Sequence, residues 1–216
     1  GSGVVATELG KGLAKKGHQV HFITYRQPAR LQHFQENLFY HEVNAADYPL
    51  FEYPPYDTAL TSKLVDIIKH EKLDLLHVHY AIPHASAAYL AKQILLAQGV
   101  SIPYVTTLHG TDITLVGKEP EFEPTISFAI NQSDVVTAVS DSLRKDTYSH
   151  FNVTKDILVV PNFVCVEKFS GEPKDCKKAT FAPNGEQILM HISNFRKVKR
   201  IQDIIKIHSR VSKTID

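Results

Sequence analysis

The sequence is short of cysteine, of long hydrophobic runs and of excess charge, and each shortage excludes a class of protein. Its two cysteines, Cys165 and Cys176, cannot build a disulfide framework and lack the close spacing of a zinc site. No hydrophobic run approaches the roughly 20 residues that span a bilayer. With 24 Lys and Arg against 23 Asp and Glu, the chain has no electrostatic basis for nucleic-acid binding. We expect a soluble, cytoplasmic protein with reduced thiols, no nucleic-acid partner and no stable membrane insertion.

Several catalytic motifs are also missing. The chain contains no Gly-x-Ser-x-Gly elbow and no Gly-Lys-Ser/Thr phosphate loop, which argues against nucleophilic hydrolases and P-loop enzymes. No two aspartates are separated by one residue, so the Asp-x-Asp motif that holds a divalent metal is absent. We therefore expect no catalytic metal and no cofactor.

The 216 residues instead show strands that alternate with helices. Strands are predicted at 19–24, 73–79, 103–108, 135–139 and 157–160, and helices at 4–13, 57–68, 83–97, 123–131 and from 140 or 141 onward. Val5, Leu9 and Leu13 would share one helix face, and Asp57 would cap the second helix. This alternation requires right-handed crossovers, so we predict an α/β fold with a Rossmann-like, mostly parallel sheet.

Composition changes near residue 167, which predicts a first domain at 1–167, a linker at 168–186 and the start of a second domain at 187–216. The second part contains a predicted strand, Gln187–Ile192, and a predicted helix, Lys199–Val211. One strand and one helix cannot bury a core. The Gly-rich start also lacks the strand that normally precedes such a turn. We therefore expect a chain truncated at both ends.

Two of four candidate site segments lie in the first half of the chain. Gly1-Ser2-Gly3 opens a helix, where free N–H groups can bind an anion or a sugar oxygen, although a purely structural turn fits equally. His77 and His79 point to the same side of a strand. A metal pair, core histidines, and ligand contact by Tyr80 or His79 all remain open for that segment, although no Cys, Asp or Glu follows His77 closely enough to complete a metal site.

The other two segments follow later strands. Residues 106–112 place hydroxyls, an imidazole and a carboxylate at a strand end, which favours a ligand site over a merely structural turn. Residues 193–200 place four cations at a helix start, where the helix dipole is already positive. A bound anion such as a diphosphate would offset that cost, and a solvated charge run is the alternative.

Together these motifs resemble the retaining family-four glycosyltransferases. The resemblance rests on Gly-Ser-Gly-x-x-Ala-Thr-Glu-Leu-Gly at the start and on residues 79–84, 107–114, 139–143 and 193–200. It covers nearly the whole chain, and it is closest to the group that joins N-acetylglucosamine to L-malate in the first step of bacillithiol biosynthesis. The resemblance implies a GT-B fold, in which an N-terminal acceptor domain and a C-terminal nucleotide-sugar domain face across a cleft.

The resemblance also implies an activity and its residues. The reaction would transfer N-acetylglucosamine from UDP-N-acetylglucosamine to the malate hydroxyl with retention and without a metal. Tyr80 and Thr107 would contact malate, His109 would lie beside the transferred sugar, and Lys199 with Arg196 would stabilise the leaving diphosphate. The remaining implied substrate-binding residues are Gly1, Ser2, Gly3, Gly110, Thr111, Asp112 and Asn194. Three unranked candidates for the malate carboxylates are Arg26, Lys63 and Arg144.

Alternative functions remain at this point. A related transferase could use an inositol phosphate or a lipid-linked sugar, and a non-catalytic module could bind a sugar nucleotide without turnover. A nicotinamide dehydrogenase is disfavoured by the incomplete glycine fingerprint and by Thr24-Tyr25-Arg26, which ends a strand without an acidic residue. The family's Glu-x7-Glu motif is missing, so we expect this chain to be inactive alone. A homo-oligomer is possible.

Overall fold

The computed structural model describes residues 1–31, 35–45, 52–115, 119–166, 170, 177–193 and 195–214. It divides into two compact units, Gly1–Val164 and Cys165–Asp216, which are described separately. Among the described residues, no helix has the length and apolar character needed to cross a membrane.

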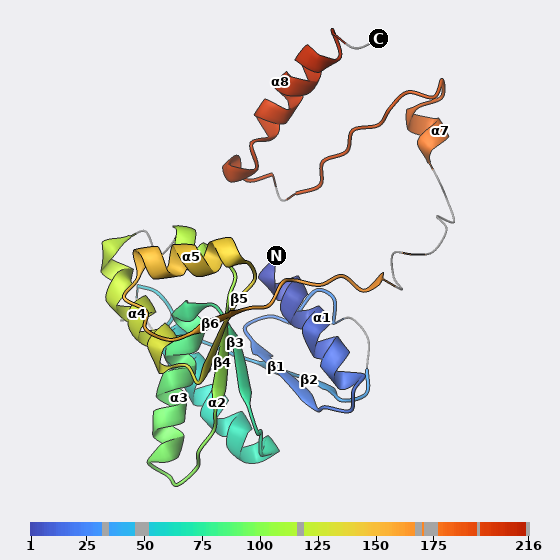
Figure 1. The fold of residues 1–216 in the computed structure, drawn as a ribbon. Helices are drawn as coiled ribbons and strands as arrows, with labels where there is room; N and C mark the ends of the chain where they lie inside the picture. The colour runs from blue at the N-terminus through green and yellow to red at the C-terminus, as the bar shows by residue number, and fades with distance from the viewer. Residues whose placement is uncertain are drawn as a thin grey trace. The chain divides into compact units, whose positions relative to one another are not determined.

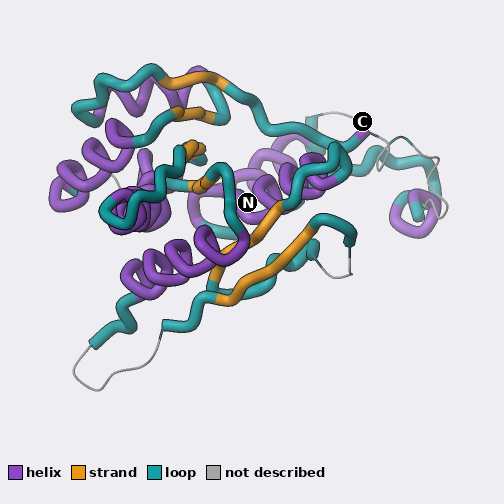
Figure 2. Tube along the Cα trace, turned by 90° about the horizontal axis from the view of Figure 1, so that it is seen from below, coloured by secondary structure: helices purple, strands orange, loops and turns teal. Residues whose placement is uncertain are grey.

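The first unit is an α/β structure in which every strand pair is parallel, as predicted (Figure 1). In chain order it contains α1 (Ser2–Ala14), β1 (Val20–Thr24), β2 (Leu38–Glu42), α2 (Tyr56–Glu71), β3 (Leu76–His79), α3 (Ser86–Leu96), β4 (Tyr104–Leu108), α4 (Glu123–Gln132), β5 (Val135–Ala138), α5 (Asp141–His150) and β6 (Ile157–Val159). One sheet has the order β1–β2 and the other β3–β4–β5–β6. Figure 2 shows strands lying between helices, the arrangement that buries both faces of a parallel sheet.

Helix α1 packs on β1 and β2 through small side chains, which corrects the predicted apolar stripe. Its buried residues are Thr7, Gly10 and Ala14, whereas Val5, Leu9 and Leu13 are only half-buried. The reason is close approach: a Cβ atom on Gly10 would lie 2.4 Å from the tip of the Phe22 ring on β1. The helix ends before Gly17, whose φ of +91° suits glycine, as the sequence predicted.

Helices α2 and α3 also begin differently from the prediction. Asp57 does not cap α2, because the helix starts at Tyr56 behind Pro55 and Asp57 lies inside its first turn. The predicted core face of α2 is nevertheless confirmed. Its buried residues include Leu60, Leu64, Ile67 and Ile68. Helix α3 begins at Ser86 rather than Pro83, after the kinked segment Ala81–Ala85, in which Ile82 has extended backbone angles. Strand β2 was not predicted at all.

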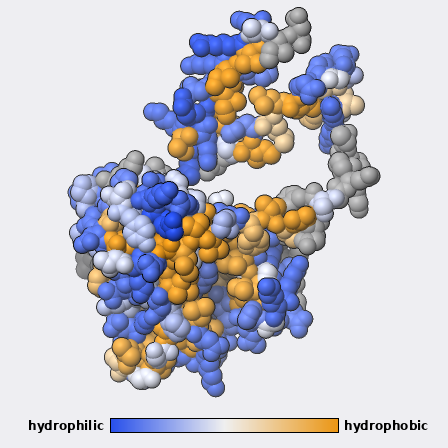
Figure 3. Space-filling view, viewed as in Figure 1, coloured by the Kyte–Doolittle hydropathy of each residue, from blue (hydrophilic) through white to orange (hydrophobic). Residues whose placement is uncertain are grey.

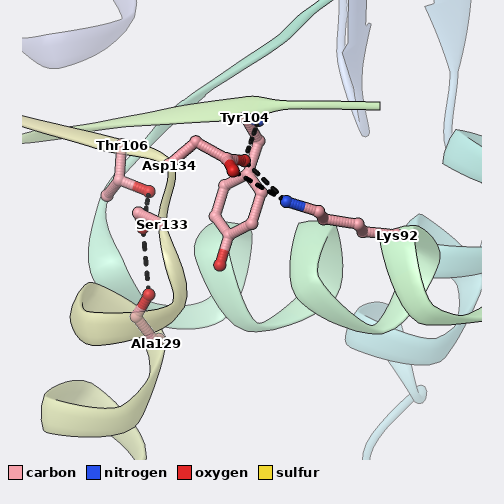
Figure 4. Close-up of polar contacts among 6 residues, drawn as sticks. All are labelled: Lys92, Tyr104, Thr106, Ala129, Ser133 and Asp134. Atoms are coloured by element: carbon pink, nitrogen blue, oxygen red, sulfur yellow. Dashed lines mark hydrogen bonds and ion pairs between the residues drawn. The ribbon is translucent and has the colours of Figure 1, made fainter. Parts of the chain in front are cut away.

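A polar network inside the unit joins three elements around the central strand β4 (Figure 4). The backbone N–H of Tyr104 donates to Asp134 at 2.7 Å, and the same carboxylate forms an ion pair with Lys92 of α3 at 2.7 Å. Two residues further along β4, the buried hydroxyl of Thr106 forms a hydrogen bond with the hydroxyl of Ser133 at 2.8 Å. The buried Thr106–Ser133 pair and the more exposed Lys92–Asp134 ion pair together tie β4 to α3 and to the end of α4.

The second unit has much less structure of its own. Within its described residues it contains α7 (Lys178–Phe181), a turn at Lys197–Lys199 and α8 (Ile201–Val211). Helix α7 lies in the predicted linker, part of which falls outside the described residues. The predicted strand Gln187–Ile192 is wrong, because these residues form no ladder, and a strand needs a partner to exist. Apolar side chains along α8 are visible in Figure 3.

Candidate active site

The candidate site lies where β3 and β4 end at the same edge of their sheet. The two strands pair in register, with His79 beside Thr107. Beyond them, Tyr80 has a φ of +86° and its N–H donates to the carbonyl of Thr107 at 3.0 Å. A bulky residue with positive φ is strained, so the surrounding contacts must hold Tyr80 in this position. The strand ends therefore place Tyr80 and the residues after Leu108 together.

Asp112 fixes the two loops that leave these strands. One carboxylate oxygen accepts from the Ala81 N–H at 2.9 Å, and the other accepts from the Gly110 N–H at 3.1 Å. The side chain is 3% exposed, and its burial raises the pKa of the carboxyl while the backbone hydrogen bonds oppose that shift. Because both oxygens are engaged by the backbone, Asp112 positions the loops rather than offering a free carboxylate. Gly110 supports this turn with a φ of +108°.

Two short chains of imidazoles and hydroxyls cross the strand ends. In the first, His77 bonds the Thr107 hydroxyl at 2.7 Å, and Thr107 bonds Thr137 of β5 at 2.7 Å. In the second, Nδ1 of His79 and Nε2 of His109 lie 2.8 Å apart. The rings of His77 and His79 stack at 4.7 Å between centroids. The arrangement holds His109 at a single orientation beside Tyr80, whose ring is 5.4 Å away.

These histidines are neutral at physiological pH. Burial above all, together with the charges of His77, His109 and His84, lowers the pKa of His79 to about 3. Burial, with the charge of His77, also lowers the pKa of His109 to about 4. The pKa of His84 is lowered by burial as well. A neutral imidazole has one N–H donor and one acceptor nitrogen, so the His79–His109 bond determines which group His109 presents outward.

The start of α1 reaches the same place. The hydroxyl of Tyr80 donates to the hydroxyl of Ser2 across 78 positions in sequence. No side chain caps this helix, and a Cβ atom on Gly1 or Gly3 would meet nothing within 4 Å. The first N–H groups of an α-helix have no partner within the helix, and the start of α1 beside Tyr80 is therefore a place where an anion can bind.

The structure thus brings most of the predicted site residues together in the first unit. Joined there are Gly1, Ser2, Gly3, Tyr80, Thr107, His109, Gly110, Thr111 and Asp112. Arg196 and Lys199 belong to the second unit, where both are exposed around the turn Lys197–Lys199. Asn194 lies outside the described residues.

The three candidate cations for an acceptor carboxylate are placed less favourably. Arg144 forms an ion pair with Asp141 within α5. Lys63 on α2 lies close enough to His41 for its charge to lower that histidine's pKa. Arg26 is exposed just after β1. None of the contacts of Arg144 or Lys63 joins them to Tyr80 or Thr107.

The sequence did not select Thr137, and it did not indicate that His77 pairs with Thr107 or His79 with His109. Thr137 stands beside Thr107 in the β4–β5 register, so its hydroxyl becomes a neighbour only when the sheet forms. The alternation of His77 and His79 on one strand did signal a shared face. It could not signal that His109, which follows the neighbouring strand β4, would form a hydrogen bond with His79.

The chain is also similar in sequence to known proteins. Residues 1–168 match the family described as Glycosyltransferase Family 4. The chain is 50% identical over 217 residues to "N-acetyl-alpha-D-glucosaminyl L-malate synthase" of Bacillus anthracis, covering 100% of this chain and 56% of that protein. It is 24% identical over 154 residues to "Putative teichuronic acid biosynthesis glycosyltransferase TuaC" of Bacillus subtilis, covering 67% of this chain and 37% of that protein.

A solved structure supports the fold. The crystal structure of a glycosyltransferase from Rickettsia africae superposes with a TM-score of 0.60 at 18% identity, covering 85% of this chain and 46% of that one. The predicted Rossmann-like, GT-B type of α/β fold is therefore confirmed for the N-terminal domain. This chain spans about half the length of the proteins that it matches. With the family match extending over most of its residues, the chain belongs to Glycosyltransferase Family 4.

Proposed function

We propose that the full-length protein is a retaining glycosyltransferase that moves N-acetylglucosamine from UDP-N-acetylglucosamine to the hydroxyl of L-malate, the first step of bacillithiol biosynthesis. The observation that carries this proposal is the 50% identity, over the whole chain, to the Bacillus anthracis protein of that name. The site geometry supports it, because an uncapped helix N-terminus and neutral imidazoles meet at one strand edge.

The start of α1 suits an acidic acceptor. Malate carries two carboxylates, and the free N–H groups at Ser2 and Gly3 with the positive end of the helix dipole favour an anion there. The paired hydroxyls of Ser2 and Tyr80 lie at the same end of the helix. Thr107 already bonds His77 and Thr137, which leaves its hydroxyl one further hydrogen bond to offer to malate.

His109 suits a position beside the transferred sugar. Cleavage of the glycosyl phosphate develops positive charge on the sugar ring, and an imidazolium there would oppose it. Because burial keeps His109 neutral, it can hydrogen-bond a sugar hydroxyl without that penalty. Asp112 keeps the turn that carries His109 in place through Gly110.

The leaving group would be stabilised by cations of the second unit. We assign Lys199 and Arg196 to the diphosphate of the donor, where their positive charges oppose the negative charge that develops on UDP, and Asn194 to substrate binding. The bond between the sugar C1 and the phosphate oxygen breaks, and a bond between C1 and the malate oxygen forms on the same face. The departing phosphate takes the proton of the malate hydroxyl, so no protein nucleophile is needed.

The test uses the full-length protein with UDP-N-acetylglucosamine in EDTA, with and without L-malate, followed by mass spectrometry of UDP and products. Malate-dependent formation of the glucosaminyl-malate conjugate is the expected result. Transfer to another hydroxy acid or polyol would retain the family and discard malate as the acceptor. Binding of the donor without any transfer would instead favour a sugar-nucleotide-binding module.

Two variants test the residue roles in the same assay. Lys199→Ala is expected to lower kcat by about 100-fold or more, as for other groups that stabilise developing charge. Lys206→Ala removes an exposed cation of α8 and serves as the matched control, with kcat unchanged. Tyr80→Phe is expected to raise the KM for malate more than it lowers kcat. Equal losses of kcat in Lys199→Ala and Lys206→Ala would show that Lys199 is not part of the site.

A second acceptor class is favoured by one observation, the 24% identity to the teichuronic acid glycosyltransferase. Acceptor choice depends on few side chains, so a sugar-linked acceptor would use the same strand edge. Competition between malate and such acceptors in the assay above separates the two.

A further inference from the structure

Two histidines and a glutamate converge on the other sheet of the first unit, away from the strand ends described above. His21 lies on β1, His41 lies on β2, and Glu71 is the last residue of α2. Each offers one ligand atom, and these three atoms all lie within 4.8 Å of one another. Their separation in sequence means that only the packing of α2 against the β1–β2 sheet brings them together.

The two imidazoles are held firmly. Nδ1 of His21 and Nε2 of His41 are 2.9 Å apart, and the two rings stack nearly parallel at 5.2 Å between centroids. The Phe39 ring covers His21 from the other side at 4.5 Å. Both histidines are half-buried on a paired strand ladder, which keeps the two nitrogens close to each other.

We propose that His21, His41 and Glu71 form a three-residue zinc-binding site that links α2 to the β1–β2 sheet. Imidazole nitrogen and carboxylate oxygen are among the ligands that Zn²⁺ prefers, and water would complete a tetrahedral set. Tetrahedral zinc places two nitrogens roughly 3.3 Å apart, so the metal would replace the 2.9 Å hydrogen bond between the two rings and turn their lone pairs toward itself. Glu71 is exposed at a helix end and can close the remaining distance by side-chain rotation.

The electrostatic surroundings are mixed but permit a cation. Burial lowers the pKa of both His21 and His41, and the neutral form is the one that binds metal. Near His41, the charges of Glu71 and Asp66 favour a cation, and those of Lys63 and His70 oppose it. Glu71 is itself a proposed ligand, so Asp66 is the further carboxylate that attracts a cation and Lys63 the charge that repels it.

This site is not catalytic and does not depend on the proposed glycosyl transfer. Its role would be to stabilise the layer formed by β1, β2 and α2, because a ligand that binds only the folded state raises its stability. Transfer in EDTA and stabilisation by zinc are therefore separate outcomes that can succeed or fail independently.

The test measures Zn²⁺ binding to the purified, chelator-treated protein by competition with a chromophoric chelator, with metal content determined after dialysis. We expect one Zn²⁺ per chain, and binding weakened about 100-fold in His21→Gln and in His41→Gln, since loss of even an outer partner costs 10- to 100-fold. Glu71→Gln, at an exposed position that fills no core, is expected to weaken binding about 10-fold. His18→Gln, an exposed histidine before β1, is the matched control with unchanged binding.

Two further readouts guard against misfolding and against binding elsewhere. Circular dichroism without metal should be the same for Glu71→Gln and the parent protein, and added zinc should raise the Tm of the parent and of His18→Gln but not of His41→Gln. With Co²⁺, the parent should show visible absorption bands that His21→Gln loses. Zinc bound equally by the parent, Glu71→Gln and His41→Gln would place the metal elsewhere and overturn the proposal.

Discussion

The two units of this chain contain the same kinds of apolar side chain but bury them to very different extents. In the first unit, Ile130 of α4 is 0% exposed within a core that joins helices to the four-stranded sheet. In the described part of the second unit, Ile205 of α8 is 63% exposed, and Ala182 is the one buried apolar residue. Both helices are amphipathic in sequence. The difference teaches that an apolar face specifies a helix, whereas a neighbouring sheet is required to bury it.

The largest expected effect on stability comes from testing this comparison with one substitution in each unit. Ile130→Ala should lower the free energy of unfolding by about 2–5 kcal/mol, because it removes a fully buried side chain and leaves a cavity. Ile205→Ala should change it by less than about 0.5 kcal/mol. Urea denaturation of the two variants and the parent measures both. Similar losses would mean that α8 is buried in solution.

Acid should weaken the first unit through its buried histidines. The pKa of His79 is about 3 when folded against 6.5 for the free side chain, so the unfolded state binds the proton first as pH falls. The stability is fully present above about pH 6.5 and is lost toward the folded pKa, at about 1.4 kcal/mol per pH unit for His79 while it stays unprotonated in the folded state.

Urea denaturation between pH 7 and pH 4 measures that slope. His79→Asn should reduce the slope in comparison with the parent, since one proton-binding group of the unfolded state is removed. His150→Asn, at an exposed position on α5, serves as the control. A slope that His79→Asn leaves unchanged would contradict the burial of His79.

Two glycines of α1 sharpen the comparison between packed and open surface. Gly10→Ala should destabilise by about 1–3 kcal/mol, because its Cβ would lie 2.4 Å from the Phe22 ring. Gly12→Ala, on the same helix with nothing within 4 Å, should stabilise by about 0.5–1 kcal/mol through helix propensity. Thermal unfolding of both variants tests the opposite signs. Equal effects would mean that α1 does not pack on β1 as described.

The last prediction concerns helix capping. The Ser140 hydroxyl accepts from the Leu143 N–H at 3.1 Å and caps α5, whereas no side chain caps α8 in its described residues. Ser140→Ala should destabilise the first unit by about 1 kcal/mol. Ser140→Asp should keep most of the stability, because aspartate is also a good cap. Identical urea midpoints for Ser140→Ala and the parent would rule out a stabilising cap.

Much of the fold could be predicted from local pattern. Leu60, Leu64 and Ile68 recur at helical spacing and are buried, and Ser140 stands where a cap is needed. The wrong predictions were also made from local sequence patterns. Asp57 is a good capping residue, but the chain enters α2 through Pro55 and gives it no such place. Residues 187–192 have strand-like composition but no partner strand within the described chain.

The candidate site was predictable in its segments and not in its connections. His77, Tyr80, His109 and Asp112 stand at strand ends, where the sequence of an α/β protein places ligand-binding groups. Only the folded structure shows that both carboxylate oxygens of Asp112 accept hydrogen bonds from backbone N–H groups. It also shows that the hydroxyl of Tyr80 donates to that of Ser2. The zinc-binding cluster proposed above has no sequence motif, because its three residues come from three elements.

By itself, the sequence determined that the chain alternates strands with helices, which helix faces are apolar and which loops carry polar groups. These properties depend on periodicity and on residues close in the chain. Only the tertiary structure decided the strand register and the neutral state of His79 and His109. It also decided that Gly10 lies so close to the Phe22 ring that no larger residue fits there. Those properties depend on which distant groups exclude water from one another, and a linear pattern does not contain that information.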